Sequence, residues 1–235
     1  MTLIPKKTYL NTYRIIDKSN LKKAIMSIKT IIFDFGGVVT NSPIEGFNKL
    51  EKTHGYDNGL ITSINMNNPN NNAWAKSERG EIGIDTFLYE FEQEALKIGH
   101  KINAKEILMQ LYGALRPIMT KKIISLYNLK KYKLICLTNV LKGVNVFTPK
   151  EREETVNNVM SYFDKIYESY KLGMRKPETR IYEHIIDDLN IKPDKTVFLD
   201  DLGMNLKTAR QLGINTIKVI NPKNAIKELD QLLEN

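Results

Sequence analysis

Four short segments of the sequence hold polar residues whose types and spacing could carry out chemistry. Three of these segments lie where apolar runs end, and the fourth lies at a loop-to-helix junction. Their polar residues are Asp34, Thr138, Asn139, Lys176, Asp200 and Asp201. Acids from two strands, with a hydroxyl and a lysine nearby, predict a site for a divalent cation and a phosphate group. In such a site the cation offsets the carboxylates, while Lys176 and Thr138 bind the remaining phosphate oxygens.

The elements that must bring these segments together are the strands of a parallel sheet. Short apolar runs predict strands at residues 30–34, 133–138, 165–169, 196–200 and 215–220, and helical patterns lie between them. The runs are continuously apolar rather than alternating, which is typical of strands covered on both faces. Ligands of an open parallel sheet bind beyond the carboxyl ends of its strands, where these polar residues fall. The predicted fold class is therefore α/β, with a Rossmann-like parallel sheet core.

A helical subdomain is predicted to interrupt this alternation after the first strand. Residues 65–72 are rich in asparagine and predict a polar loop, and helical patterns follow at 73–80, 84–98 and 104–115. We interpret the insertion as a cap over the site. The predicted organisation is a basic extension at 1–27, an α/β core formed by 28–42 and 116–235, and a helical cap at 43–115. One further helix is predicted within residues 147–163.

The first 25 residues differ in composition from the rest. They carry six basic residues and a single acid, Asp17, and Met26 then leads directly into the first strand. Met26 as the true initiator and residues 1–25 as an organellar targeting segment are the two alternatives. Without such targeting, we expect a cytoplasmic protein.

The overall composition excludes several classes of protein. No apolar stretch approaches the roughly 20 residues that span a bilayer. The net charge of +8 comes from scattered lysines without a nucleic-acid signature, so no nucleic-acid partner is predicted. His54, His100 and His184 have no metal-ligand spacing, and the single Cys136, inside an apolar run, is interpreted as a buried hydrophobe.

The four segments together resemble the haloacid dehalogenase superfamily of hydrolases. Residues 33–39 (FDFGGVV) resemble its first motif, residues 137–139 (LTN) its second, Lys176 within LGMRKP its third, and residues 198–201 (FLDD) followed by Asn205 its fourth. The GMRKP segment, LDDLGMNL, and SERGEI at 77–82 resemble the subgroup that contains the N-terminal phosphatase domain of soluble epoxide hydrolases.

The resemblance implies a role for each matching residue. Asp34 would be the nucleophile that forms an aspartyl-phosphate intermediate. Mg²⁺ would be bound by the carboxylates of Asp34 and Asp201 and the backbone carbonyl of Gly36. Two further residues would have supporting roles, Asp200 around the metal and Asn205 in the following loop. The phosphoryl oxygens would be held by Thr138, the Asn139 amide and Lys176.

One catalytic position departs from this pattern. Phosphatases of the superfamily carry a second Asp two residues after the nucleophile, and Gly36 stands there in this chain. That Asp normally protonates the leaving alcohol, a contribution of about 10²–10⁴-fold in rate. There are three explanations. An acid from the cap (Glu45, Glu78 or Glu81) replaces the missing Asp, water suffices for a slow enzyme, or the protein has lost turnover.

The sequence leaves three candidate functions. The first is Mg²⁺-dependent hydrolysis of a small phosphorylated metabolite. The second is a catalytically silent binding or regulatory protein, and the third is halide release from a C–Cl bond. The Gly-Gly turn and the paired acids at 200–201 favour phosphate chemistry.

Overall fold

The computed structural model describes residues 27–234, so the basic extension, apart from its last residue, lies outside the described part of the chain. The core is a five-stranded sheet, all parallel, in the order β3-β2-β1-β4-β5. This confirms the predicted α/β class. The strands are β1 (Thr30–Phe33), β2 (Lys133–Thr138), β3 (Lys165–Glu168), β4 (Thr196–Asp200) and β5 (Asn215–Lys218).

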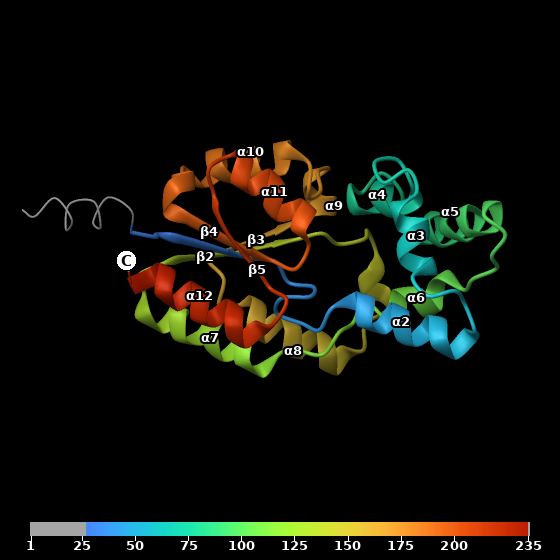
Figure 1. The fold of residues 1–235 in the computed structure, drawn as a ribbon, viewed down its shortest axis with the longest axis horizontal. Coiled ribbons are helices and arrows are strands. Elements are labelled where there is room, and N and C mark those ends of the chain that lie inside the picture. Colours follow the sequence, from blue (N-terminus) through green and yellow to red (C-terminus); the bar gives the residue numbers. More distant parts are fainter. Residues whose placement is uncertain (1–26, 235) are drawn as a thin grey trace, which may run out of the picture.

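Helices cover both faces of the sheet (Figure 1). One apolar layer packs α7, α8 and α12 under the sheet, and another packs α10 and α11 over it. Buried residues of β1 serve both layers, because successive side chains of a strand point to opposite faces: Ile31 and Phe33 face one layer and Ile32 the other. The core helices are α7 (Pro117–Leu129), α8 (Lys150–Met160), α9 (Ser169–Leu172), α10 (Thr179–Leu189), α11 (Gly203–Gln211) and α12 (Pro222–Glu234).

The segment between β1 and α7 forms a separate helical body at one end of the sheet (Figure 1). Its apolar cluster centres on Trp74, which contacts Phe47, Phe87 and Phe91 edge to face. Trp74 is therefore a core residue of this body. Its helices are α2 (Pro43–His54), α3 (Leu60–Met66), α4 (Ala73–Glu78), α5 (Ile84–Lys97) and α6 (Ala104–Met109). We call these helices and their connections the cap; its boundaries at 43 and 115 stay a prediction.

Several predicted element ends were wrong by a few residues. The third strand ends at Glu168 because Ser169 begins α9, and the fifth ends at Lys218. The helix predicted to reach residue 115 ends at Met109, and residues 147–163 contain only the shorter α8, preceded by a 3₁₀ turn (Val144–Phe147). The asparagine-rich segment is not wholly a loop, since its start belongs to α3 and Asn72 caps α4 by accepting a hydrogen bond from the Ala75 N–H.

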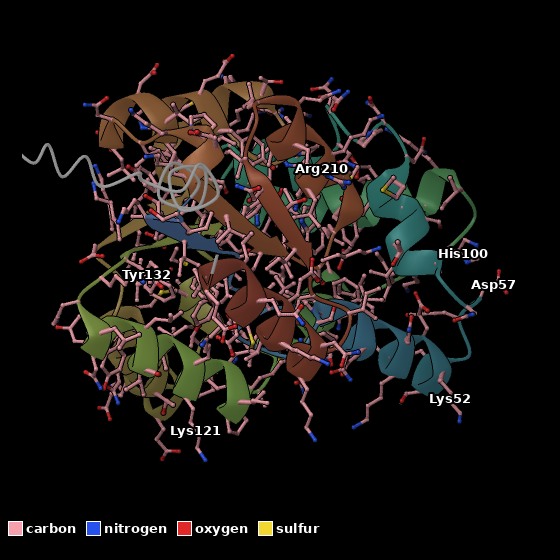
Figure 2. All side chains as sticks on the ribbon, turned by 60° about the vertical axis from the view of Figure 1, so that its left-hand side comes forward. Lys52, Asp57, His100, Lys121, Tyr132 and Arg210 are labelled. Carbon is pink, nitrogen blue, oxygen red and sulfur yellow. The ribbon has the colours of Figure 1, made fainter. Side chains whose placement is uncertain are left out.

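Basic side chains are distributed around the molecule, as the scattered lysines predicted. Figure 2 shows Lys52 on α2, Lys121 on α7 and Arg210 on α11 in three well-separated places, and all three are exposed. Within residues 27–234, no helix has the length and apolar character that a membrane span requires. Cys136 is buried, as predicted, and burial raises the pKa of its thiol far above the usual range.

Candidate functional site

Parallel pairing places the ends of β1, β2 and β4 side by side. The register pairs Phe33 with Cys136 on one side and with Leu199 on the other, so the residue after Phe33 lies beside the ends of both neighbouring strands. That residue is Asp34, whose backbone N–H donates to the Leu199 carbonyl at 2.9 Å. The sheet therefore brings three of the four predicted segments together.

Three carboxylates meet at this edge. One oxygen from each of Asp34, Asp200 and Asp201 lies within 4.8 Å of the other two, and this is the single cluster of potential metal ligands found among residues 27–234. Asp34 and Asp200 are buried and Asp201 is partly buried. Burial raises the pKa of Asp34 well above its usual range; Lys176 opposes this shift, and Asp200 adds to it. Burial, together with the charge of Asp200, also raises the pKa of Asp201.

Lys176 joins the cluster from the loop before α10. Its side chain is 1% exposed, and its ammonium lies 2.8 Å from Asp34 Oδ1 and 2.8 Å from Asp200 Oδ2. Burial alone would lower the pKa of this lysine, but the carboxylates of Asp200 and Asp34 outweigh burial and raise it. The ammonium is therefore charged at neutral pH and stays fixed between the two acids.

The two aspartates that follow β4 have different surroundings. Asp200 accepts hydrogen bonds from Lys176 Nζ, from the Leu202 N–H at 2.7 Å and from Asn205 Nδ2, which is 3.0 Å from both carboxylate oxygens. Asp201 accepts only a 3.3 Å bond from the Ser42 hydroxyl among the side chains described. Both carboxylate oxygens of Asp200 are thus used in hydrogen bonds within the protein, including those from Asn205. The carboxylate of Asp201 retains the capacity to bind a ligand.

The turn after Asp34 depends on its two glycines in different ways. Gly37 has φ +79°, and a Cβ there would lie 2.1 Å from Asp201 Oδ2, so only glycine lets the backbone approach that carboxylate. Gly36 has no heavy atom within 4 Å of its Cβ position and no positive φ. Arg116, which the sequence reasoning missed, donates from Nη1 to the Gly37 carbonyl at 2.8 Å and fixes the turn.

Thr138, the last residue of β2, and Asn139, which follows it, differ in their hydrogen bonds. Thr138 is buried, and the bond its hydroxyl donates, to the Asn139 carbonyl at 3.5 Å, is too long to occupy it firmly. The side chain of Asn139 is fully engaged by the Lys176 backbone and by Glu78. Any ligand contact at residue 139 therefore falls to its backbone N–H rather than to its side-chain amide.

The candidate replacement acids have different surroundings. Glu45 is 64% exposed and lies 3.8 Å from Arg116, and Glu81 is paired with Arg79 and is 48% exposed. Glu78 is buried and contacts Asn139, directly after Thr138. Ser42, Arg116 and Glu78 received no definite role from the sequence, because each acts through a partner more than 60 residues away.

Comparison with known proteins places this architecture in a family. The sequence profile of the haloacid dehalogenase-like hydrolases matches residues 28–213. Over 88% of its length the chain is 33% identical to mouse acyl-CoA dehydrogenase family member 10, and over 30% it is 48% identical to mouse bifunctional epoxide hydrolase 2. The chain spans only 19% and 13% of these two relatives.

Two matches from Bacteroides thetaiotaomicron, one to a sequence and one to a solved structure, cover nearly the full length of the matched chain. A D-ribitol-5-phosphate phosphatase is 26% identical over 88% of this chain and 98% of its own. A haloacid dehalogenase family enzyme crystallised with magnesium and inorganic phosphate has a TM-score of 0.54 at 26% identity, covering 82% of this chain and 94% of its own. The motifs, the sheet order and the profile match agree, and the chain belongs to the haloacid dehalogenase-like hydrolases.

Proposed function

We propose that this hydrolase is a Mg²⁺-dependent phosphatase that cleaves a small phosphate ester through Asp34. The observation that carries the proposal is the meeting of three carboxylates and the Lys176 ammonium at the carboxyl ends of β1 and β4. The match to the D-ribitol-5-phosphate phosphatase and the match to the family enzyme crystallised with magnesium and inorganic phosphate support it.

The cluster has the charge and the ligand type that Mg²⁺ requires. Three ionised carboxylates against one ammonium leave two negative charges in a largely buried site, which one divalent cation would balance. Burial raises the pKa values of Asp34 and Asp201, and the neighbouring charge of Asp200 adds to both shifts, so a bound cation would favour the ionised forms of these carboxylates. Hard oxygen ligands suit Mg²⁺. We assign the ligands to the carboxylates of Asp34 and Asp201 and to the Gly36 carbonyl, with Asp200 as their support.

The residues of the chain would divide the reaction between them. Both hydrogen bonds to the Asp34 carboxylate, from Phe35 N–H and Lys176, fall on Oδ1, so we assign the attack on phosphorus to Oδ2. The P–O bond to the leaving alcohol breaks as the aspartyl-phosphate bond forms. Water then attacks the phosphorus, which releases inorganic phosphate and regenerates the carboxylate.

Transition-state charge on the phosphoryl oxygens would be stabilised from two sides. The Lys176 ammonium and the hydroxyl of Thr138 are the donors that this site offers, together with the Asn139 N–H. Bound Mg²⁺ would supply further Lewis-acid stabilisation of the same charge. Because Lys176 is held by Asp34 and Asp200 before any ligand arrives, little reorganisation is needed during the reaction.

Gly36 shapes the predicted selectivity. Position 36, two residues after Asp34, carries no carboxyl group that could protonate the leaving oxygen. Esters with weakly basic leaving groups should therefore react best. We therefore infer a slow or selective phosphatase that prefers aryl over alkyl phosphates.

The test is a panel of phosphorylated metabolites and 4-nitrophenyl phosphate, assayed with Mg²⁺ and with EDTA. Asp34→Asn, which keeps the shape of the side chain without the nucleophile, is the control. Metal-dependent phosphate release that disappears in Asp34→Asn supports the proposal. Phosphate release that survives in Asp34→Asn, or release unaffected by EDTA, overturns it.

Gly36 also favours one second candidate, a binding protein without turnover. One observation distinguishes this binding protein from the phosphatase: a phosphorylated ligand and Mg²⁺ would stabilise the fold against unfolding, and no phosphate would be released. Metal-independent halide release from a chlorinated acid would instead identify the third alternative.

A further inference from the structure

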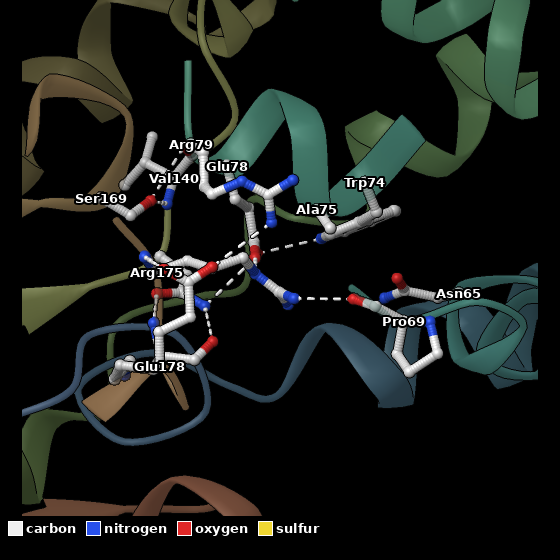
Figure 3. Close-up of polar contacts among 12 residues, drawn as sticks. Asn65, Pro69, Trp74, Ala75, Glu78, Arg79, Val140, Ser169, Arg175 and Glu178 are labelled. Atoms are coloured by element: carbon white, nitrogen blue, oxygen red, sulfur yellow. Dashed lines mark hydrogen bonds and ion pairs between the residues drawn. The ribbon is translucent and has the colours of Figure 1, made fainter. Parts of the chain in front are cut away.

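Glu78, the last residue of α4, holds a buried junction between the cap and the core (Figure 3). Its side chain is 9% exposed and accepts hydrogen bonds from three donors. Oε1 takes the Trp74 indole N–H at 3.0 Å, while Oε2 takes Asn139 Nδ2 at 3.1 Å and the Nε of Arg175. One donor thus belongs to its own helix, and two belong to the core segments that carry Asn139 and Lys176.

Asn139 links Glu78 to Lys176 through hydrogen bonds of its side-chain amide. Its Oδ1 accepts from the Lys176 N–H at 2.9 Å, and its Nδ2 donates to the Lys176 carbonyl at 2.9 Å as well as to Glu78. A side-chain amide has two N–H donors, so Glu78 and the Lys176 carbonyl together use both of them. The orientation of the Asn139 amide, and with it the backbone of Lys176, is thereby fixed from the cap.

Arg175 forms a second connection beside the first. Besides its ion pair with Glu78, its Nη1 donates to the Pro69 carbonyl of the cap at 3.0 Å. Its neighbour Lys176 then reaches Asp34 and Asp200 with the ammonium. The two groups that hold the backbone around Lys176, the Asn139 amide and the Arg175 guanidinium, therefore meet at one carboxylate, Glu78.

We propose that Glu78 is a positioning residue, which couples docking of the cap to placement of the Lys176 ammonium through Asn139 and Arg175. This inference rests on the proposed phosphatase function of Lys176. It also argues against Glu78 as the replacement for the acid missing at Gly36, because both of its carboxylate oxygens already accept hydrogen bonds, from three donors in all.

The kinetic test compares Glu78→Gln with Glu51→Gln. The amide introduced by Glu78→Gln has only one acceptor oxygen, so it loses either the bond from Trp74 or the bonds from Asn139 and Arg175. In both orientations it removes the negative charge that pairs with Arg175. Glu51 is also a buried cap carboxylate, but its partners, the N–H groups of Gly59 and Ile61, lie inside the cap. We expect Glu78→Gln to lower kcat about tenfold or more, by the same factor on aryl and alkyl phosphates and with little change in KM. Glu51→Gln should lower the Tm and leave kcat unchanged.

Three results would overturn the inference. An equal kcat in Glu78→Gln and wild type removes the positioning role, and a rise in KM alone makes Glu78 a substrate-binding residue. A loss confined to alkyl phosphates identifies it as the leaving-group acid. If Glu78→Gln does not fold, Arg175→Gln, which deletes the ion pair but leaves the Glu78–Asn139 bond, is expected to lower kcat in the same direction, and no loss there overturns the inference.

A readout without turnover separates this inference from the function on which it rests. The Lys176 ammonium is buried between two carboxylates, so its protons should exchange slowly enough to give a resolved signal in ¹⁵N-lysine NMR, assigned by its loss in Lys176→Met. Glu78→Gln should shift or broaden that signal, and Glu51→Gln should not. A shifted signal in a protein that cleaves no phosphate ester supports the positioning role and refutes the phosphatase. An unshifted signal in an active enzyme supports the phosphatase and refutes the positioning role of Glu78.

Discussion

Restoring an acid at position 36 is the most direct test of how this site would work. The substitution is Gly36→Asp, and the turn has room for it. No heavy atom lies within 4 Å of the Cβ position, and the backbone is outside the left-handed region, so a side chain there needs no rearrangement. The Gly36 carbonyl, our proposed metal ligand, belongs to the backbone and is kept.

The expected gain is the value of general acid catalysis. A positioned acid contributes about 10²–10⁴-fold, or roughly 3–5 kcal/mol of transition-state stabilisation. Alkyl phosphates should receive this gain, because their alkoxide leaving groups need a proton. A nitrophenolate leaves without one, so 4-nitrophenyl phosphate should change little. The ratio of the two kcat/KM values should therefore move toward the alkyl substrate by about 10²-fold or more.

The assay is release of inorganic phosphate from an alkyl and an aryl ester at saturating Mg²⁺, for wild type, Gly36→Asp and Gly36→Ala. Gly36→Ala fills the same space without an acid and should behave like wild type. Gly37→Ala is the steric contrast, because its Cβ would meet Asp201 at 2.1 Å and should abolish activity on both esters. A folded Gly36→Asp with an unchanged alkyl rate, or a wild type that cleaves both esters equally, would refute the reasoning.

Three further predictions concern the acids. Mg²⁺ at about 100 times its Kd should raise the Tm of wild type by about 5–10 °C and that of Asp201→Asn far less, measured by thermal unfolding with and without EDTA; equal shifts would remove Asp201 from the metal site. Asp34→Asn should lose phosphate release entirely and yet unfold at a higher temperature than metal-free wild type, since it removes a carboxylate whose pKa is raised by burial; a lower Tm would contradict this. Burial also raises the pKa of Glu94, whose Oε2 is buried without a hydrogen-bond partner among the residues described. Ionisation of Glu94 therefore lowers the stability of the fold as the pH rises above the pKa that Glu94 has in the unfolded chain. Glu94→Gln should therefore raise the Tm at pH 7.5, and the gain should vanish near pH 4, which is about the ordinary pKa of a glutamate; a Tm difference independent of pH would count against this explanation.

The sequence predicted the core well because its signals are local. Continuous apolar runs marked all five strands, and three of them end in the residues that meet at the site. The ends of elements were predicted less well, since capping decides them. The third strand, for example, stops where Ser169 starts a helix, and Asn72 turns part of a predicted loop into a helix cap.

The side-chain partners at the site could not be predicted in the same way. The resemblance implied that Asn139 would hold phosphate, but it gave no indication that the side-chain amide is bound to Lys176 and Glu78. The bond between Asn139 and Glu78 joins residues 61 apart, and the one between Ser42 and Asp201 joins residues 159 apart. No periodicity or motif in a single sequence encodes such contacts, because they depend on how the cap and the core pack.

The sequence by itself determined the order of the chemical groups along the chain, from Asp34 to Thr138, Lys176 and the acid pair at 200–201, and thereby the family. Only the tertiary structure decided which acid is braced and which is open, that Gly37 must lack a side chain while Gly36 need not, and that a cap glutamate is joined to the lysine segment. The physical reason is that residue types and spacing fix local conformation, whereas burial, charge compensation and hydrogen-bond saturation arise only when distant segments share the same few ångströms.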